Sequence, residues 1–234
     1  MLDPMSSADT LAPETPTPKP PRLVLDGVLA FPPNRDTMGG TAYWVQEEAG
    51  NILVDCPAWD AANRAFVEAR GGVRWLVLTH RGAIAQAPAI QRDLHCEIVI
   101  QEQEAYLLPD LSPTTFQTAL ELSPLSRVLW TSGHSPGSAC LYHQRHGGIL
   151  FTGRHLLPNR EGDPVPLRVS KTFHWPRQLR SIATLQATFS PETLQWICPG
   201  ANTGFLRGKR AIDRAYERLS QLDLEALRWM PPGL

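Results

Sequence analysis

The sequence is poor in cysteine and has no closely spaced cysteine pair. Its four cysteines lie at least forty residues apart and form no C-x-x-C motif. A zinc ribbon or a thioredoxin-type redox site needs such a pair, so both are excluded. We expect these residues to be free, buried thiols: Cys56, Cys96, Cys140 and Cys198.

Long apolar runs and an excess of one charge are also lacking. No stretch approaches the roughly 18 apolar residues that span a bilayer, so we expect no membrane span. The first twelve residues contain acids and no apolar core, which does not resemble a signal peptide, and a cytoplasmic location is the expectation. A formal net charge of -1 gives no general attraction to nucleic acid, and we expect no nucleic-acid partner.

The remaining composition is that of a folded domain preceded by a tail. Hydrophobic residues make up 42% of the 234 residues, enough for one core. The segment 6–21 is rich in Pro, Thr and Ser and has few apolar residues. We therefore predict a disordered tail over residues 1–21 and a single domain over residues 22–234.

Alternating strand and helix patterns fill the domain. Residues 22–31 are predicted as a strand, 41–46 and 51–56 as a β-hairpin, and the first half then continues with helices and buried strands that should pair in parallel. The second half predicts an antiparallel meander over 127–152, a helix over 176–189, a buried strand over 194–200 and a long amphipathic helix over 209–229. Basic residues early in that last helix are expected on a solvated face. The other predicted elements are helices over 59–70 and 85–94 and strands over 74–79 and 96–101.

Several buried strands end abruptly in polar or glycine-rich turns, which is where α/β proteins present functional groups. These strand ends read THRGAIA from Thr79, GHSPGS from Gly133, TGRH from Thr152 and CPGANTG from Cys198, and an earlier strand ends NILVDCP. In this order and spacing they resemble the metal-binding loops of the metallo-β-lactamase superfamily. The resemblance covers roughly residues 39–204, and it implies a four-layer αββα sandwich of two mixed sheets flanked by helices.

Most ligand positions of that family differ in this chain. The family's first loop usually reads T-H-x-H-x-D-H, so the resemblance keeps His80 and, in the second loop, His134. Its other first-loop ligands are replaced by Gly82, Ile84 and Ala85. The bridging Asp of the third loop is replaced by Arg154, and the late His by Ala201.

This loss predicts a degenerate metal site. Catalytic zinc needs about three protein ligands, and the lost Asp is also the family's water-orienting group. We therefore expect no cofactor and a non-catalytic protein that binds a small anionic ligand or a protein partner. The predicted ligand cleft consists of His80, Arg81, His134, Ser135, Arg154, His155 and Ala201.

Two alternatives stay open at this stage. The first is an active hydrolase of thioester, lactone or phosphoester substrates that uses one zinc or iron held by His80, His134 and a third residue such as His155. The second is an assembly factor whose outer surfaces alone matter. His143 and His146 flank a predicted turn and are expected to be solvated, and Trp175 is the best candidate for an exposed aromatic.

Overall fold

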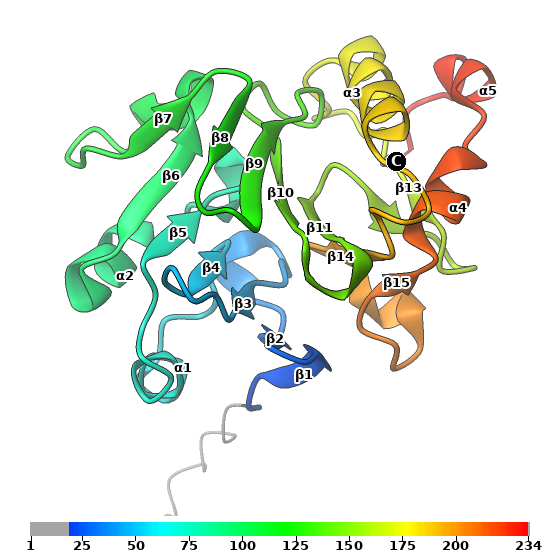
Figure 1. The fold of residues 1–234 in the computed structure, drawn as a ribbon. Coiled ribbons are helices and arrows are strands. Elements are labelled where there is room, and N and C mark those ends of the chain that lie inside the picture. The colour runs from blue at the N-terminus through cyan, green and yellow to red at the C-terminus, as the bar shows by residue number, and fades with distance from the viewer. Residues whose placement is uncertain (1–18, 234) are drawn as a thin grey trace, which may run out of the picture.

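The computed structural model describes residues 19–233, so most of the predicted tail lies outside the described residues. Two β-sheets pack face to face, and helices cover both outer faces (Figure 1). The α/β architecture predicted from the sequence, two mixed sheets flanked by helices, is confirmed. Within the described residues, no helix is long and apolar enough to cross a membrane.

The first sheet has seven strands in sequence order, antiparallel from β1 to β4 and parallel from β4 to β7. Its strands are β1 (Arg22–Leu25), β2 (Val28–Ala30), β3 (Tyr43–Val45), β4 (Ile52–Val54), β5 (Trp75–Val77), β6 (Glu97–Gln101) and β7 (Thr114–Phe116). The predicted strand over 22–31 is a hairpin instead, because Gly27, with φ +73°, allows the chain to turn between β1 and β2. The hairpin of β3 and β4 and the parallel pairing of β4, β5 and β6 are confirmed.

The second sheet has six strands in the order β15-β14-β11-β10-β9-β8. Its central strands form the predicted meander, and β14 lies parallel to β11. The strands are β8 (Ala119–Glu121), β9 (Ser126–Trp130), β10 (Ala139–His143), β11 (Ile149–Gly153), β14 (Trp196–Pro199) and β15 (Ile212–Asp213). A small separate hairpin joins β12 (Leu157–Pro158) to β13 (Pro164–Val165).

Apolar side chains fill three layers. One cluster lies between the sheets, a second lies between the first sheet and helices α1 (Ala61–Glu68) and α2 (Ala87–Leu94), and a third lies under α3 (Trp175–Thr188). All four cysteines are free and buried, as predicted. Short 3-10 helices occupy the loops: η1 (Arg35–Thr37), η2 (Arg81–Ala83), η3 (Glu102–Leu107), η4 (Arg145–Gly147) and η5 (Thr203–Leu206).

The long C-terminal helix predicted over 209–229 is wrong. The chain forms strand β15 and two short helices, α4 (Ala215–Ser220) and α5 (Leu224–Arg228). Arg214 adopts a left-handed backbone with φ 46°, which no helix interior allows, and Asp223 caps α5 by accepting from the amides of Glu225 and Ala226. The basic residues therefore do not share one helix face.

Two predictions about aromatic and histidine side chains are also wrong. Trp175 is buried, and its Nε1 donates to the carbonyl of Leu227. Trp229 is the exposed tryptophan, at 78%. His143 lies inside β10, where Nδ1 is 2.8 Å from the Ser126 hydroxyl, whereas His146 is exposed as expected.

Candidate functional site

Three strands of the two sheets bring His80, His134 and Arg154 together. His80 follows β5, His134 lies in the turn after β9, and Arg154 follows β11 directly. The rings of His80 and His134 meet edge to face with centroids 5.2 Å apart. Burial lowers the pKa of both imidazoles, and the charge of Arg154 lowers both further.

The orientation of His80 is determined by a hydrogen-bond chain from Asp55. Asp55 is buried at the end of β4, and its Oδ1 accepts from the Thr79 amide at 2.8 Å. The Thr79 hydroxyl lies 2.9 and 2.8 Å from the two carboxylate oxygens and 3.0 Å from His80 Nδ1. A carboxylate only accepts, so Thr79 donates to Asp55 and its oxygen accepts from His80 Nδ1–H. His80 Nε2 therefore carries a free lone pair.

Burial keeps the histidines of this cluster neutral. Desolvation, with His134, Arg154 and Arg81 as further causes, lowers the pKa of His80 well below its usual value. Desolvation, followed by the charges of Arg154 and Arg81, lowers the pKa of His134 to about 4. The same burial lowers the pKa of His155 to about 3. Each ring therefore offers one donor and one acceptor at neutral pH.

The pKa of Asp55 moves the other way. Desolvation raises it to about 6, although hydrogen bonds from Thr79 and the charge of Arg154 act to lower it. Burial thus outweighs the nearby guanidinium. At neutral pH Asp55 is still mostly ionised and partly offsets the charge of Arg154.

Several buried polar atoms of this region have no hydrogen-bond partner within the described part of the chain. They are His80 Nε2, both ring nitrogens of His155, Arg154 Nε and Gln178 Oε1. His155 is 1% exposed, and its carbonyl accepts from Gln178 Nε2 at 3.0 Å. Native proteins rarely leave buried polar atoms unsatisfied, so this group of atoms is suited to hold ordered water or a ligand.

Arg154 also holds a neighbouring loop. Its Nη2 donates to the carbonyls of Thr37 and Met38 at 3.0 and 2.9 Å. Met38, with φ 53°, is 68% exposed. A Cβ added at Gly82 would lie 3.2 Å from His80 Nε2 and 3.7 Å from Met38 Cε, so Met38 borders the open side of His80.

The other predicted cleft residues are Ser135, Arg81 and Ala201. Ser135 is buried in the turn and hydrogen-bonds to Ser138 through both its amide and its hydroxyl. Arg81 is exposed at the start of η2, and Ala201 is 5% exposed beside Gly200. Asp55 and Gln178 contribute to this region but were not among the predicted cleft residues. The strand end NILVDCP drew attention to Asp55 in the sequence, whereas no local sequence pattern pointed to Gln178.

These residues do not fit the metal centre that the resemblance implies. Within residues 19–233, no group of three or more His, Cys, Asp or Glu side chains is arranged to hold a metal ion. Arg154 brings a cation where two metal ions would need a carboxylate to offset their charge. The Asp55 carboxylate accepts hydrogen bonds from the amide and the hydroxyl of Thr79, so it does not replace a missing metal ligand.

Comparison with solved structures places this architecture in a known fold. A metallo-β-lactamase family protein from Thermus thermophilus superposes with a TM-score of 0.63 at 17% identity, over 88% of this chain and 81% of its own. The metallo-β-lactamase DIM-1 superposes with a TM-score of 0.65 at 17% sequence identity, over 90% of this chain and 98% of its own. The metallo-β-lactamase FIM-1 from Pseudomonas aeruginosa, in its mono-zinc form, superposes with a TM-score of 0.62 at 18% sequence identity, over 90% of this chain and 97% of its own.

No protein-family model and no curated protein matches the sequence. At these low identities the structural matches establish the metallo-β-lactamase fold and nothing about activity.

Proposed function

We propose that this protein is a non-catalytic member of the metallo-β-lactamase fold that binds a small anion beside His80, His134 and Arg154. The observation that carries the proposal is the position of Arg154, which follows β11 directly and donates to the carbonyl of Met38, the residue that borders the open side of His80. A cation that also leaves a buried Nε unpartnered favours an anionic ligand.

The neutral histidines restrict which hydrogen-bonding groups that anion must carry. His80 Nε2 is an acceptor, and His155 offers one donor and one acceptor, all without protein partners in the described chain. A ligand that satisfies them needs both acceptor oxygens and at least one hydroxyl. Hydrogen phosphate or a hydroxy acid has this combination.

Burial favours a small molecule over a protein partner. His80 is 5% exposed and His155 1%, so a partner's acidic side chain would have to enter between the loops to reach them. A small anion reaches the same atoms with less rearrangement of the surface.

The test is stabilisation by inorganic phosphate, read as the thermal midpoint against phosphate concentration at constant ionic strength. We expect the parent protein to gain stability that saturates, following RT ln(1 + [L]/Kd), about 2.7 kcal/mol at a hundredfold excess over Kd. Arg154→Ala should lose this gain. Arg180→Ala, which removes one exposed arginine of α3, should keep it. Equal, non-saturating responses in all three proteins would refute the proposal, because excluded salts stabilise proteins non-specifically.

Elemental analysis distinguishes the rival hydrolase. A mononuclear enzyme would need His80, His134 and His155 on one ion, so protein purified without chelator or affinity tag would contain about one equivalent of zinc or iron. Such a stoichiometry, abolished in His80→Ala, would replace our proposal with the enzymatic one.

A further inference from the structure

A second pocket lies apart from the histidine cluster. It has a volume of about 330 Å³, is partly open to solvent and is lined by the segment 19–22, the end of β2 and the loop that follows β14. Backbone hydrogen bonds connect this pocket with the end of β11: the Thr41 amide donates to the Gly200 carbonyl, and the Gly200 amide donates to the Gly153 carbonyl. None of the predicted cleft residues lines it.

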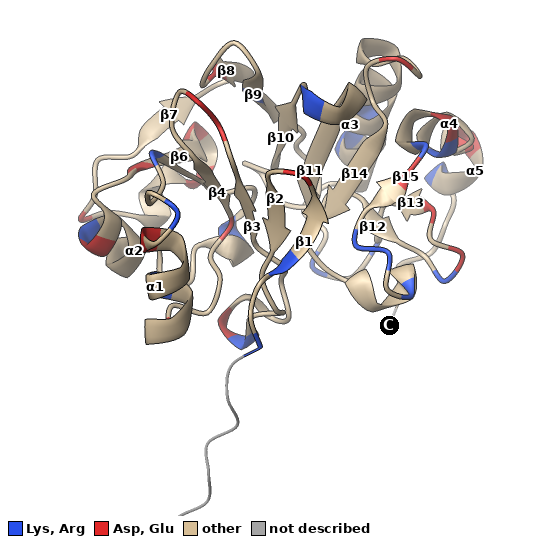
Figure 2. Ribbon diagram, turned by 60° about the horizontal axis from the view of Figure 1, so that its bottom comes forward, with Lys and Arg blue, Asp and Glu red and all other residues tan. Residues whose placement is uncertain are grey.

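The charged residues that line this pocket are all basic. They are Lys19, Arg22, Lys209 and Arg210. Figure 2 shows basic residues at the start of β1 and on the loop that leads to β15, where the two sheet edges approach each other. The pocket therefore has a positive potential.

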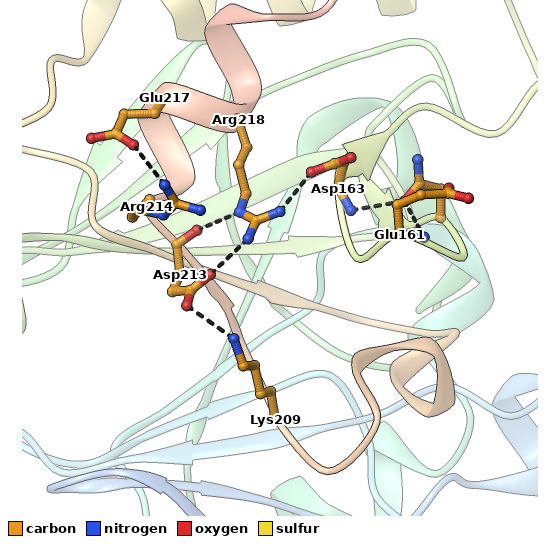
Figure 3. Close-up of polar contacts among 8 residues, drawn as sticks. Glu161, Asp163, Lys209, Asp213, Arg214, Glu217 and Arg218 are labelled. Carbon is orange, nitrogen blue, oxygen red and sulfur yellow. Dashed lines mark hydrogen bonds and ion pairs between the residues drawn. The ribbon is translucent and has the colours of Figure 1, made fainter.

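Neighbouring contacts hold two of these cations at the pocket. Lys209 forms an ion pair with Asp213 at 3.3 Å, and Asp213 is in turn bonded by Arg218 (Figure 3). Arg210 donates to the carbonyl of Leu23 on β1. Lys19 and Arg22 form no ion pair with any other described residue.

An unsatisfied buried hydroxyl lines the same pocket. Thr41 is 4% exposed, and its Oγ1 has no hydrogen-bond partner within the described residues. Buried hydroxyls nearly always have a partner, so a ligand oxygen or a water is expected there. This observation is independent of the charges.

The remaining wall is apolar. Phe31, Pro32 and Pro33 line it together with Ala30. A free inorganic ion would leave this wall facing water, whereas an organic group attached to the ion would cover it. The volume is at the lower end of the range for small-ligand pockets.

We propose that this pocket, which we call the Thr41 pocket, binds a small organic phosphate, with the phosphate among the four cations and the Thr41 hydroxyl and the organic group against Phe31 and its neighbouring prolines. Three of these cations, Lys19, Arg22 and Arg210, form no ion pair with another described residue, and their charges favour a phosphate dianion over a single carboxylate charge. This site uses none of the cluster residues and stands whether or not the cluster binds an anion.

The experiment is calorimetric titration with phenyl phosphate at low ionic strength. We expect one saturable site for phenyl phosphate in the parent protein. Compared in Arg154→Ala, where the histidine cluster should no longer bind phosphate, inorganic phosphate and benzoate should both bind more weakly at it. Thr41→Val should raise the Kd about tenfold, because it removes a hydrogen bond to a charged group and keeps the side-chain volume. Since the lost hydroxyl has no protein partner among the described residues, this variant should keep the parent's thermal midpoint.

Further variants assign the binding to one site. Arg22→Ala should weaken binding several-fold, and Arg180→Ala, the same charge change on the outer helix α3, should leave it unchanged. Arg154→Ala should also leave it unchanged, which separates this pocket from the histidine cluster. Binding that is lost in Arg154→Ala and kept in Thr41→Val would overturn the proposal, as would absence of saturable binding. Benzoate binding as tightly as phenyl phosphate would overturn the assignment to phosphates.

Discussion

Two glycines allow the neighbouring strands β11 and β14 of the second sheet to end close together at the candidate site. Gly153 ends β11 with φ +50°, and a Cβ on Gly200 would lie 2.7 Å from the Cα and carbonyl oxygen of Gly153. The Gly200 amide donates to the Gly153 carbonyl across this contact, with an N···O distance of 2.7 Å. Arg154 and Ala201 follow directly in the sequence, so this close approach sets the position of both.

We predict that Gly200→Ala costs about 3 kcal/mol of unfolding free energy, because the added carbon meets backbone, which has little room to move. Gly204→Ala is the matched control, since a Cβ there meets nothing within 4 Å, and it should change stability by less than about 0.5 kcal/mol. Urea denaturation measures both. A Gly200→Ala protein as stable as the control would show that the strand ends tolerate separation.

Individual residues also show where sequence patterns stop being informative. The predictions for His80, His134 and Arg154 began from strand ends, and these residues do lie close together. The hydrogen bonds from Arg154 to Thr37 and Met38 were not predictable, because they join residues more than a hundred positions apart through backbone carbonyls that any residue supplies. Burial of Trp175 depends likewise on a carbonyl of the distant helix α5.

At the scale of elements, Arg218 joins three segments of the C-terminal region. From α4 it donates to Asp163, beside β13, at 2.6 Å and to Asp213 of β15 at 3.1 Å (Figure 3). These contacts join α4 and β15 to the small separate hairpin of β12 and β13. They also show that Arg218, which the sequence pattern placed on a solvated helix face, forms ion pairs with Asp163 and Asp213.

We predict that Arg218→Ala destabilises the protein by about 1 kcal/mol, reduced by solvent screening because its partners are about one-third exposed. Arg228→Ala removes an ion pair with Glu225 whose side chains are 60% and 68% exposed, and it should have no measurable effect. Thermal unfolding at 0.1 M and 1 M NaCl provides the measurement. The difference between the two variants should shrink at high salt, and a difference that persists unchanged would argue for packing instead of charge.

Prediction of the elements succeeded where local patterns are strong. The hairpin of β3 and β4, with its polar turn, and the helix α1, which was predicted to stop before Gly71 and ends at Glu68, follow from turn and capping residues. Strands β7 and β8, of three residues each, were not among the predicted elements. The C-terminal helix was predicted wrongly because its apolar spacing continues through Arg214, whose left-handed backbone is fixed by tertiary contacts.

For the whole molecule, four histidines with lowered pKa values contribute to the response to acid. Burial lowers the pKa of each, to about 4 for His134 and about 3 for His155. An unfolded histidine binds its proton near pH 6.5. These groups therefore contribute stability above pH 6.5 that is lost as the pH falls toward the native values. Asp55, with a raised pKa of about 6, acts oppositely, because the native state takes up its proton first.

We predict a fall in unfolding free energy between pH 7 and pH 5, with a slope of about 1.4 kcal/mol per pH unit for each net proton bound on unfolding. Asp55→Asn removes the opposing group, so its slope should be steeper than that of the parent, whatever its absolute stability. Urea titrations at fixed pH values give both slopes. A parent protein equally stable at pH 7 and pH 5 would contradict this prediction.

The four buried thiols lie in different layers of the sandwich. Cys56 and Cys96 pack under α1 and α2, Cys198 lies between the sheets, and Cys140 lies in the apolar layer under α3. Burial raises the pKa of every one of them, so none reacts as a thiolate while its layer stays closed. The order in which an alkylating reagent modifies these thiols during unfolding therefore reports the order in which the layers open.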